Sequence, residues 1–137
     1  MIMKYRLFSF FLFITLACRQ EKATTIVLND GKTMVTRIDI DDSGPLKIVL
    51  YPGKSKEELP NSFVYAEYKR LLDGYEAILL NKEDSIFLFQ ESGDFKYFGI
   101  DSNLIFIKDV EADSFLRIFN CSKKMGYKLV SNYGSSE

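Results

Sequence analysis

The sequence predicts an all-β fold made of short antiparallel strands in meanders. Short apolar runs recur along the chain after residue 24, and turn-like segments rich in Gly, Asn, Asp and Ser separate them. Aromatic residues make up 15% of the chain, and they carry much of the burial in a small β domain. Because 137 residues suit one domain, we expect a single β-rich unit.

Turn signals separate the strands expected in the first half of the chain. Asn29-Asp30-Gly31 predicts a hairpin turn, because Gly tolerates positive φ. Residues 33–40 then alternate between two parities, which is typical of a strand with two different faces. The predicted strands are 25–28, 33–40 and 46–51, with a turn at 41–45 and a polar loop at 52–62.

The stretch 63–80 has two interpretations. Val64, Tyr68 and Leu71 keep helical spacing, but Asp73-Gly74 interrupts the pattern. A Gly inside a helix costs about 1 kcal/mol relative to Ala. We therefore favour two strands joined at Asp73-Gly74, and an α+β fold with one helix near 61–72 stays open as the alternative.

The strand pattern strengthens in the second half. Several runs there, such as 85–89 and 104–107, show little alternation, which is typical of strands covered on both faces. A packed pair of sheets is therefore expected. The predicted strands are 77–80, 85–89, 95–98, 104–107, 115–119 and 127–130.

Two segments of this half are expected to be blade-like repeats. Residues 75–98 and 104–130 both follow the order strand, polar turn, strand, Gly-containing turn, strand. In this order the chain resembles bacterial lipoproteins with six-bladed β-propellers and NHL-like repeats. A blade takes about 40–45 residues, so the chain is too short to close such a ring. The resemblance implies a propeller fragment from a truncated relative, and a small β-sandwich is the other possibility.

The first 17 residues are typical of an export signal. Lys4 and Arg6 form a short basic region, and an uncharged apolar run from Leu7 to Ala17 follows. This run is too short to cross a bilayer as a helix, which needs about 20 residues. We therefore predict a signal peptide over residues 1–17.

The residues at the end of this segment, Thr15-Leu16-Ala17-Cys18, resemble the lipobox of bacterial lipoproteins. The resemblance implies cleavage between Ala17 and Cys18 and acylation of Cys18. Residues 18–23 are then a polar tether and residues 24–137 the folded domain. In the alternative, the protein is secreted with an ordinary thiol at Cys18, which is free to form a disulfide with Cys121. If Cys18 is acylated, Cys121 is expected to be a small buried hydrophobic residue.

Composition excludes several kinds of chemistry. The chain has no His, so it cannot form a Ser-His-Asp triad or a His-ligated zinc site. A net charge of −1 without a basic stripe argues against nucleic acid as a partner. Residues 39–44 resemble the start of a calcium loop, but the twelfth position, which requires Glu, is Leu50. We expect no metal, no cofactor and no catalytic residue.

Two groups of side chains remain as weaker candidates. The acidic pairs Glu57-Glu58, Glu83-Asp84 and Asp39/Asp41 have the chemistry of a glycosidase pair, but they fall in turns, where solvated charge is usual. Tyr side chains offer contact area with a polar tip and suit sugar or protein partners. The tyrosines considered for a binding surface are Tyr51, Tyr65, Tyr68, Tyr75, Tyr97 and Tyr127.

The residues and the resemblance together predict a membrane-anchored exported lipoprotein. We expect a non-enzymatic binding or interaction module at the bacterial cell envelope, with the outer membrane favoured over the inner. Its partners would be the membrane, through the N-terminal lipid, and a protein or glycan of unknown identity. The alternatives are a small exported enzyme that acts on glycans, and an inhibitor or immunity-type protein.

Overall fold

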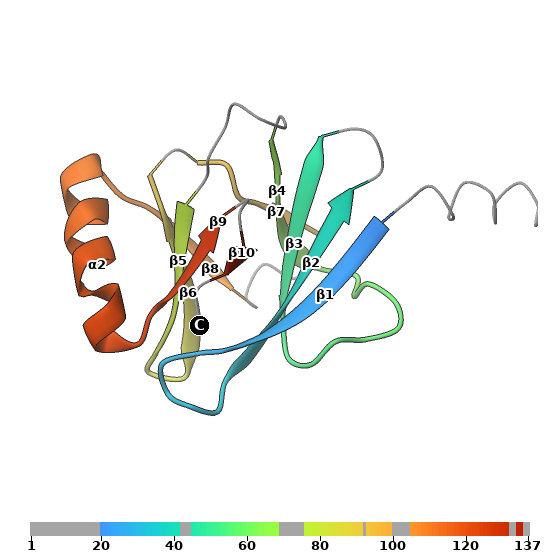
Figure 1. The fold of residues 1–137 in the computed structure, drawn as a ribbon, viewed down its shortest axis with the longest axis horizontal. Helices are drawn as coiled ribbons and strands as arrows, with labels where there is room; N and C mark the ends of the chain where they lie inside the picture. The colour runs from blue at the N-terminus through green and yellow to red at the C-terminus, as the bar shows by residue number, and fades with distance from the viewer. Residues whose placement is uncertain are drawn as a thin grey trace, which may run out of the picture.

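The computed structural model describes residues 20–41, 45–68, 76–91, 93–99, 105–131 and 134–135. These residues form two five-stranded sheets that pack face to face, and one helix lies against the outer face of the second sheet (Figure 1). The fold is therefore mostly β, with antiparallel meanders and one helix among the described residues. This confirms the predicted fold class, in its sandwich form.

Sheet A contains the first strands of the chain, and all of its pairs are antiparallel. Its order is β1 (Gln20–Val27), β2 (Met34–Asp41), β3 (Leu46–Pro52), β4 (Phe63–Tyr68) and β7 (Lys96–Phe98). Sheet B has the order β10 (Gly134–Ser135), β9 (Lys128–Ser131), β5 (Glu76–Lys82), β6 (Ser85–Gln90) and β8 (Phe106–Asp109). Only the β6–β8 pair of these described strands is parallel.

The main core lies between the two sheets. Val35, Ile48 and Leu50 of sheet A are fully buried against Leu79 and Leu88 of sheet B. Alternate residues of a strand point to opposite faces, so each strand contributes every second side chain to this core. Burial of these side chains is the main source of the stability of the sandwich.

The alternative helix near 61–72 is wrong for the part that the structure describes. Phe63–Tyr68 forms β4, which pairs with both β3 and β7. The next described strand, β5, begins at Glu76, and Asp73-Gly74 lies outside the described residues.

The strand predicted over 115–119 is also wrong, because these residues lie in helix α2 (Ala112–Met125). Phe115, Ile118 and Phe119 fall on one helical face and pack against sheet B. Gly126 ends the helix with φ of 75°, a left-handed conformation that favours Gly. The repeat expected over 104–130 therefore lacks its middle strand.

Helix α2 explains the weak alternation of the strands in sheet B. Ile86 and Leu88 of β6 are buried on the inner side, whereas Phe87 and Phe89 pack in the cluster beneath the helix. Strand β6 is therefore covered on both faces, as its apolar run predicted. The described helix is 14 residues long, and no helix within the described ranges is long and apolar enough to cross a bilayer.

The folded part begins earlier than the sequence indicated. Strand β1 starts at Gln20 and pairs with β2 from that residue onward, with Gln20 opposite Asp41. Four residues of the segment 18–23, expected to be a tether, therefore belong to the sheet. Cys18 is two positions before the first residue of β1.

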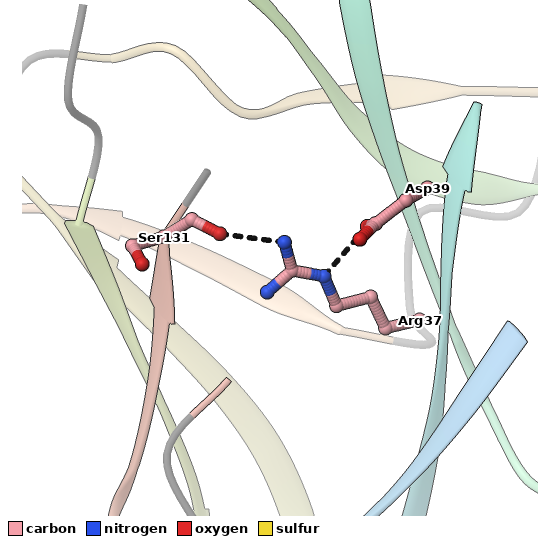
Figure 2. A network of polar contacts seen from close by, with 3 residues as sticks. All are labelled: Arg37, Asp39 and Ser131. Carbon is pink, nitrogen blue, oxygen red and sulfur yellow. Dashed lines mark hydrogen bonds and ion pairs between the residues drawn. The ribbon is translucent and has the colours of Figure 1, made fainter. Parts of the chain in front are cut away.

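A buried guanidinium connects the two sheets. Arg37 of β2 is only 2% exposed; its Nε donates to Asp39 Oδ1 at 2.7 Å and its Nη2 to the Ser131 carbonyl of β9 at 2.5 Å (Figure 2). Hydrogen bonds that involve a charged group are stronger than those between neutral groups. The pair of contacts therefore fixes the position of β9 relative to β2.

The β1–β2 turn is stabilised by Asp30. The Asp30 carboxylate accepts hydrogen bonds from the Lys32 and Thr33 backbone N–H groups, at 3.1 and 2.8 Å, and from the Thr33 hydroxyl. The hydroxyl contact is the largest cause that lowers the pKa of Asp30 below its ordinary value. These bonds favour the charged form, so they hold the turn best when Asp30 is ionised.

We predict that Arg37→Met lowers the free energy of unfolding by about 1–3 kcal/mol, because the part-buried Ser131 carbonyl and the Asp39 carboxylate each lose a donor. The measurement is denaturant unfolding. Lys47→Met removes a half-exposed ion pair and serves as the control, with an expected change of less than about 1 kcal/mol. Equal stability of Arg37→Met and the unsubstituted protein would contradict this role.

We predict that the Asp30 carboxyl titrates below its ordinary pKa, measured by NMR. Thr33→Val should raise this pKa toward the ordinary value, because the hydroxyl donor is lost. Because the pKa of Asp30 is lower in the folded than in the unfolded chain, ionised Asp30 stabilises the fold. This stabilisation is present above the unfolded pKa and is lost as the pH falls through the folded pKa. An unchanged titration in Thr33→Val would show that the hydroxyl has no such effect.

Candidate functional site

The outer faces of the two sheets differ. Helix α2 packs on the outer face of sheet B, whereas the outer face of sheet A carries an apolar hollow of about 300 Å³. We call it the sheet A hollow. Its lining comes from four strands and one loop, and consists of Ile40, Lys47, Val49, Leu59, Phe63, Tyr65, Glu67 and Phe98.

Strand parity places these side chains on the outer face. In β3, Ile48 and Leu50 enter the core between the sheets, so Lys47 and Val49 point the other way. In β4, Val64 points inward, and its neighbours Phe63 and Tyr65 point outward. The floor of the hollow belongs to a second apolar cluster of Ile38, Ile40, Val49 and Tyr51, against which Phe63 and Tyr65 pack.

One end of the hollow is aromatic. Phe63 and Phe98 are cross-strand partners, with ring centroids 4.7 Å apart and ring planes 17° apart. Tyr65 meets Phe98 edge to face at 6.3 Å. Phe98 is 54% exposed, although one face of its ring stacks on Phe63. This end therefore offers ring surface to solvent.

Backbone packing holds this aromatic end in place. Gly99 directly follows β7, and its backbone lies against the Asn61 carbonyl and Ser62. A Cβ at residue 99 would overlap these atoms, and φ of 97° also favours Gly. The close approach positions β7, and with it Phe98, beside the start of β4.

The other end of the hollow is charged. Lys47 Nζ lies 3.7 Å from Glu67 Oε1, and both side chains are partly exposed. Lys96 is opposite Tyr65 in the β4–β7 register, so it lies on the same outer face beside the aromatic end. An exposed ion pair of this kind contributes little to stability, about 0–1 kcal/mol. The charges at this end are therefore accessible to a bound group.

The hollow has the size of a small binding site. Its volume is at the lower limit of ligand sites, which run from about 300 to 1,000 Å³. It holds one or two side chains, with apolar groups at the aromatic end and charged groups at the other. The residues that line it include one carboxylate, that of Glu67.

The structure brings few of the predicted tyrosines to this site. Tyr65 lines the hollow, and Tyr51 lies in the cluster beneath it, where its hydroxyl accepts from the Lys56 backbone N–H at 3.0 Å. The Tyr97 hydroxyl accepts from the Ile107 N–H, and Tyr127 packs beneath α2. The side chains of Tyr68 and Tyr75 lie outside the described residues.

The acidic pairs lie apart from one another. Glu57 and Glu58 are exposed in the loop after β3, and Glu83 and Asp84 are exposed in the β5–β6 turn. Asp39 pairs with Arg37 between the sheets. Within the described ranges no group of three or more His, Cys, Asp or Glu side chains is arranged to hold a metal. Part of the predicted calcium-like segment, residues 42–44, is outside those ranges.

The prediction that Cys121 is buried is wrong. Cys121 lies in α2 and is exposed, while its neighbour Ser122 is buried. The prediction assumed a strand end, and in a helix the inward face is shared by Phe115, Ile118 and Ser122 instead. Ala17 and Cys18, the predicted cleavage and lipidation residues, lie outside the described residues.

Sequence reasoning missed Phe98, Phe63, Leu59 and Lys96. One signal was present in β2. Residues 38 and 40 are both Ile, and they lie on the face of the strand opposite to Val35 of the core. Apolar residues on both parities of a strand indicate that both faces are covered or used. Nothing in the local pattern showed that β4 and β7 are neighbours.

No protein-family model matches this chain, and neither a curated protein nor a solved structure matches it. The site is therefore interpreted from its own geometry.

Proposed function

We propose that this protein is a non-enzymatic binding module, held at the bacterial cell envelope by a lipid on Cys18, and that the sheet A hollow is its binding surface. The observation that carries the proposal is the exposed aromatic end of the hollow beside a charged end. Exposed apolar patches rimmed by polar groups are typical of interaction sites.

The hollow fits an extended segment of another protein. Aromatic and aliphatic anchors supply most of the energy at protein interfaces, and Phe98 and Leu59 offer such contacts. Lys96 and Phe98 are two residues apart on one face of β7, which is about 7 Å. A segment with a large apolar side chain and, two residues away, an acidic side chain complements both positions.

A sugar is a weaker match to the same surface. A sugar presents many hydroxyls, each of which needs a hydrogen-bonding partner when it is buried. Most residues that line the hollow are apolar, and the polar groups gather at one end. We therefore propose a protein segment as the ligand.

The anchor would hold the domain close to the bilayer. Only Arg19 separates Cys18 from the first residue of β1. Several acyl chains bind a membrane stably, at about 0.8 kcal/mol per buried methylene, whereas one chain is marginal. With so short a connection, the domain would be limited to ligands at or near the membrane surface.

We predict that Cys18→Ala releases the protein from membranes, because the acylated sulfur is lost. The measurement is membrane fractionation followed by intact mass spectrometry. Cys121→Ser, which removes the exposed thiol of α2, is the matched control and should stay in the membrane fraction. Membrane association of Cys18→Ala equal to that of the control would refute the anchor.

We predict that Phe98→Ser weakens peptide binding at the hollow about tenfold or more, equivalent to about 1.4 kcal/mol. The probe is an acetylated peptide Gly-Phe-Gly-Asp-Gly, and binding is followed by NMR shifts of the β4 and β7 amides. A second probe with Lys in place of Asp should bind more weakly, because it faces Lys96.

The control for this experiment is Leu116→Ser. Leu116 is 56% exposed on α2, so its exposure is similar to that of Phe98, but it lies far from the hollow in the fold. Its substitution should leave binding unchanged. Equal losses in both variants, or shifts produced by an oligosaccharide such as maltotriose and not by the peptide, would overturn the proposed ligand.

A further inference from the structure

Strand β1 is a long sheet edge, and among the described strands it pairs with β2 alone. It contains eight residues, and its pairing with β2 runs through all of them without interruption. The other terminal strands of the described sheets are shorter: β7 has three residues, β8 four and β10 two. The β8 edge is also capped, because the Ile107 N–H donates to the Tyr97 hydroxyl at 2.7 Å.

Most of the described side chains of β1 are also exposed to solvent. All five residues from Glu21 to Thr25 are exposed, although their strand lies in a sheet. Figure 1 shows β1 at the end of sheet A that is opposite to β7. Long edges of this kind can pair with another strand, and proteins usually shorten, cover or charge them. Here β1 has no Pro and no bulge along its register with β2.

The hydrogen-bond pattern shows which residues of β1 face outward. The Leu28 N–H donates to the Thr33 carbonyl at 2.8 Å, so this pair is hydrogen-bonded. Hydrogen-bonded and non-hydrogen-bonded pairs alternate along an antiparallel ladder. Even-numbered residues of β1 therefore direct their backbone groups to β2. Ala23, Thr25 and Val27 direct theirs away from the sheet.

We propose that β1 pairs with β1 of a second copy of this chain, antiparallel, about a two-fold axis that passes through Thr24 perpendicular to sheet A. Such an axis keeps each face of the sheet on the same side, so residues of equal parity oppose one another. The outward-facing backbone groups belong to odd-numbered residues. They can bond across the interface only if odd-numbered residues of the two copies lie opposite one another. This proposal does not depend on the ligand of the hollow.

Charge disfavours two of the alternative registers. An axis at Lys22 would place two lysines directly opposite, which destabilises a strand pair, and an axis at Ala23 would make them diagonal neighbours. With the axis at Thr24, Lys22 is opposite the partner's Ile26, four positions from the partner's Lys22 along the strand pair. Glu21 is then opposite the partner's Val27, which is 40% exposed in the single chain.

The central pairs of this register are also favourable. Thr24 is opposite the partner's Thr24, a cross-strand pairing that stabilises sheets. Ala23 is opposite the partner's Thr25 and exchanges both backbone hydrogen bonds with it. The two copies of sheet A become one continuous sheet, and both sheet A hollows lie on the same face of it.

The first test is disulfide cross-linking of the full chain in detergent, in a Cys121→Ser background. In the proposed register Thr24→Cys places two Cβ atoms about 4.5–5.5 Å apart in a non-hydrogen-bonded pair, close to disulfide geometry. Mild oxidation should then give a covalent dimer. Glu21→Cys is the matched control: six positions separate the two copies of residue 21 along the strand pair, so it should stay monomeric. The background protein alone accounts for any reaction of Cys18.

The second test uses Ala23→Pro. Ala23 directs its N–H away from β2, so Pro at this position removes a donor of the new interface and none of the β1–β2 ladder. The mass measured by sedimentation should fall from that of a dimer to that of a monomer, while circular dichroism stays unchanged; Ala23→Ser should remain a dimer. A monomeric unsubstituted protein, or equal cross-linking of Thr24→Cys and Glu21→Cys, would overturn the proposal.

Discussion

The sandwich depends on a charged side chain placed where apolar residues usually pack. Arg37 extends from β2 into the space between the sheets and donates to the Ser131 carbonyl of β9, which is 94 residues later in the chain. A buried guanidinium must be paired, because an unpaired charge in an apolar site costs several kcal/mol. This requirement restricts the sheets to an arrangement in which β9 lies across from β2. The last strands of the chain are thereby tied to the first.

The same constraint decides which face of β2 carries the hollow. With Arg37 and Asp39 on the inner parity, Ile38 and Ile40 are left on the outer parity, where they form the floor of the hollow with Val49. On sheet B the outer face is also apolar, and α2 covers it by packing on Ile78 and Leu80. Two chemically similar faces therefore have different outcomes: one is completed by a helix of the same chain, and the other presents aromatic rings to solvent.

Local sequence patterns predicted most strands. They failed where packing against elements distant in the sequence determines the structure. Alternation and the Asn29-Asp30-Gly31 turn were sufficient for β2, β3 and the end of β1, but the start of β1 at Gln20 was missed. The Asp-Gly pair correctly argued against one long helix over 63–80. The segment 115–119 failed because five mostly apolar residues fit a strand or a helix equally well. The longer spacing through Ser122 and the Gly at 126 carried the helical signal. The hollow could not be predicted, because β4 and β7 are not consecutive, and the contact between Phe63 and Phe98 exists only after β7 joins sheet A.

The proposed lipid anchor and the proposed β1 pairing restrict each other. In an antiparallel pair centred on Thr24, the two copies of Gln20 are eight positions apart along the strand direction, or about 27 Å. Each anchor at Cys18 is two residues from such a strand start. Both anchors reach one bilayer only if the two-fold axis is close to the membrane normal. Because this axis is perpendicular to sheet A, the continuous sheet would lie parallel to the membrane, and both hollows would face the same way. Two sites with one orientation favour a ligand that presents repeated segments, since the second contact is then intramolecular.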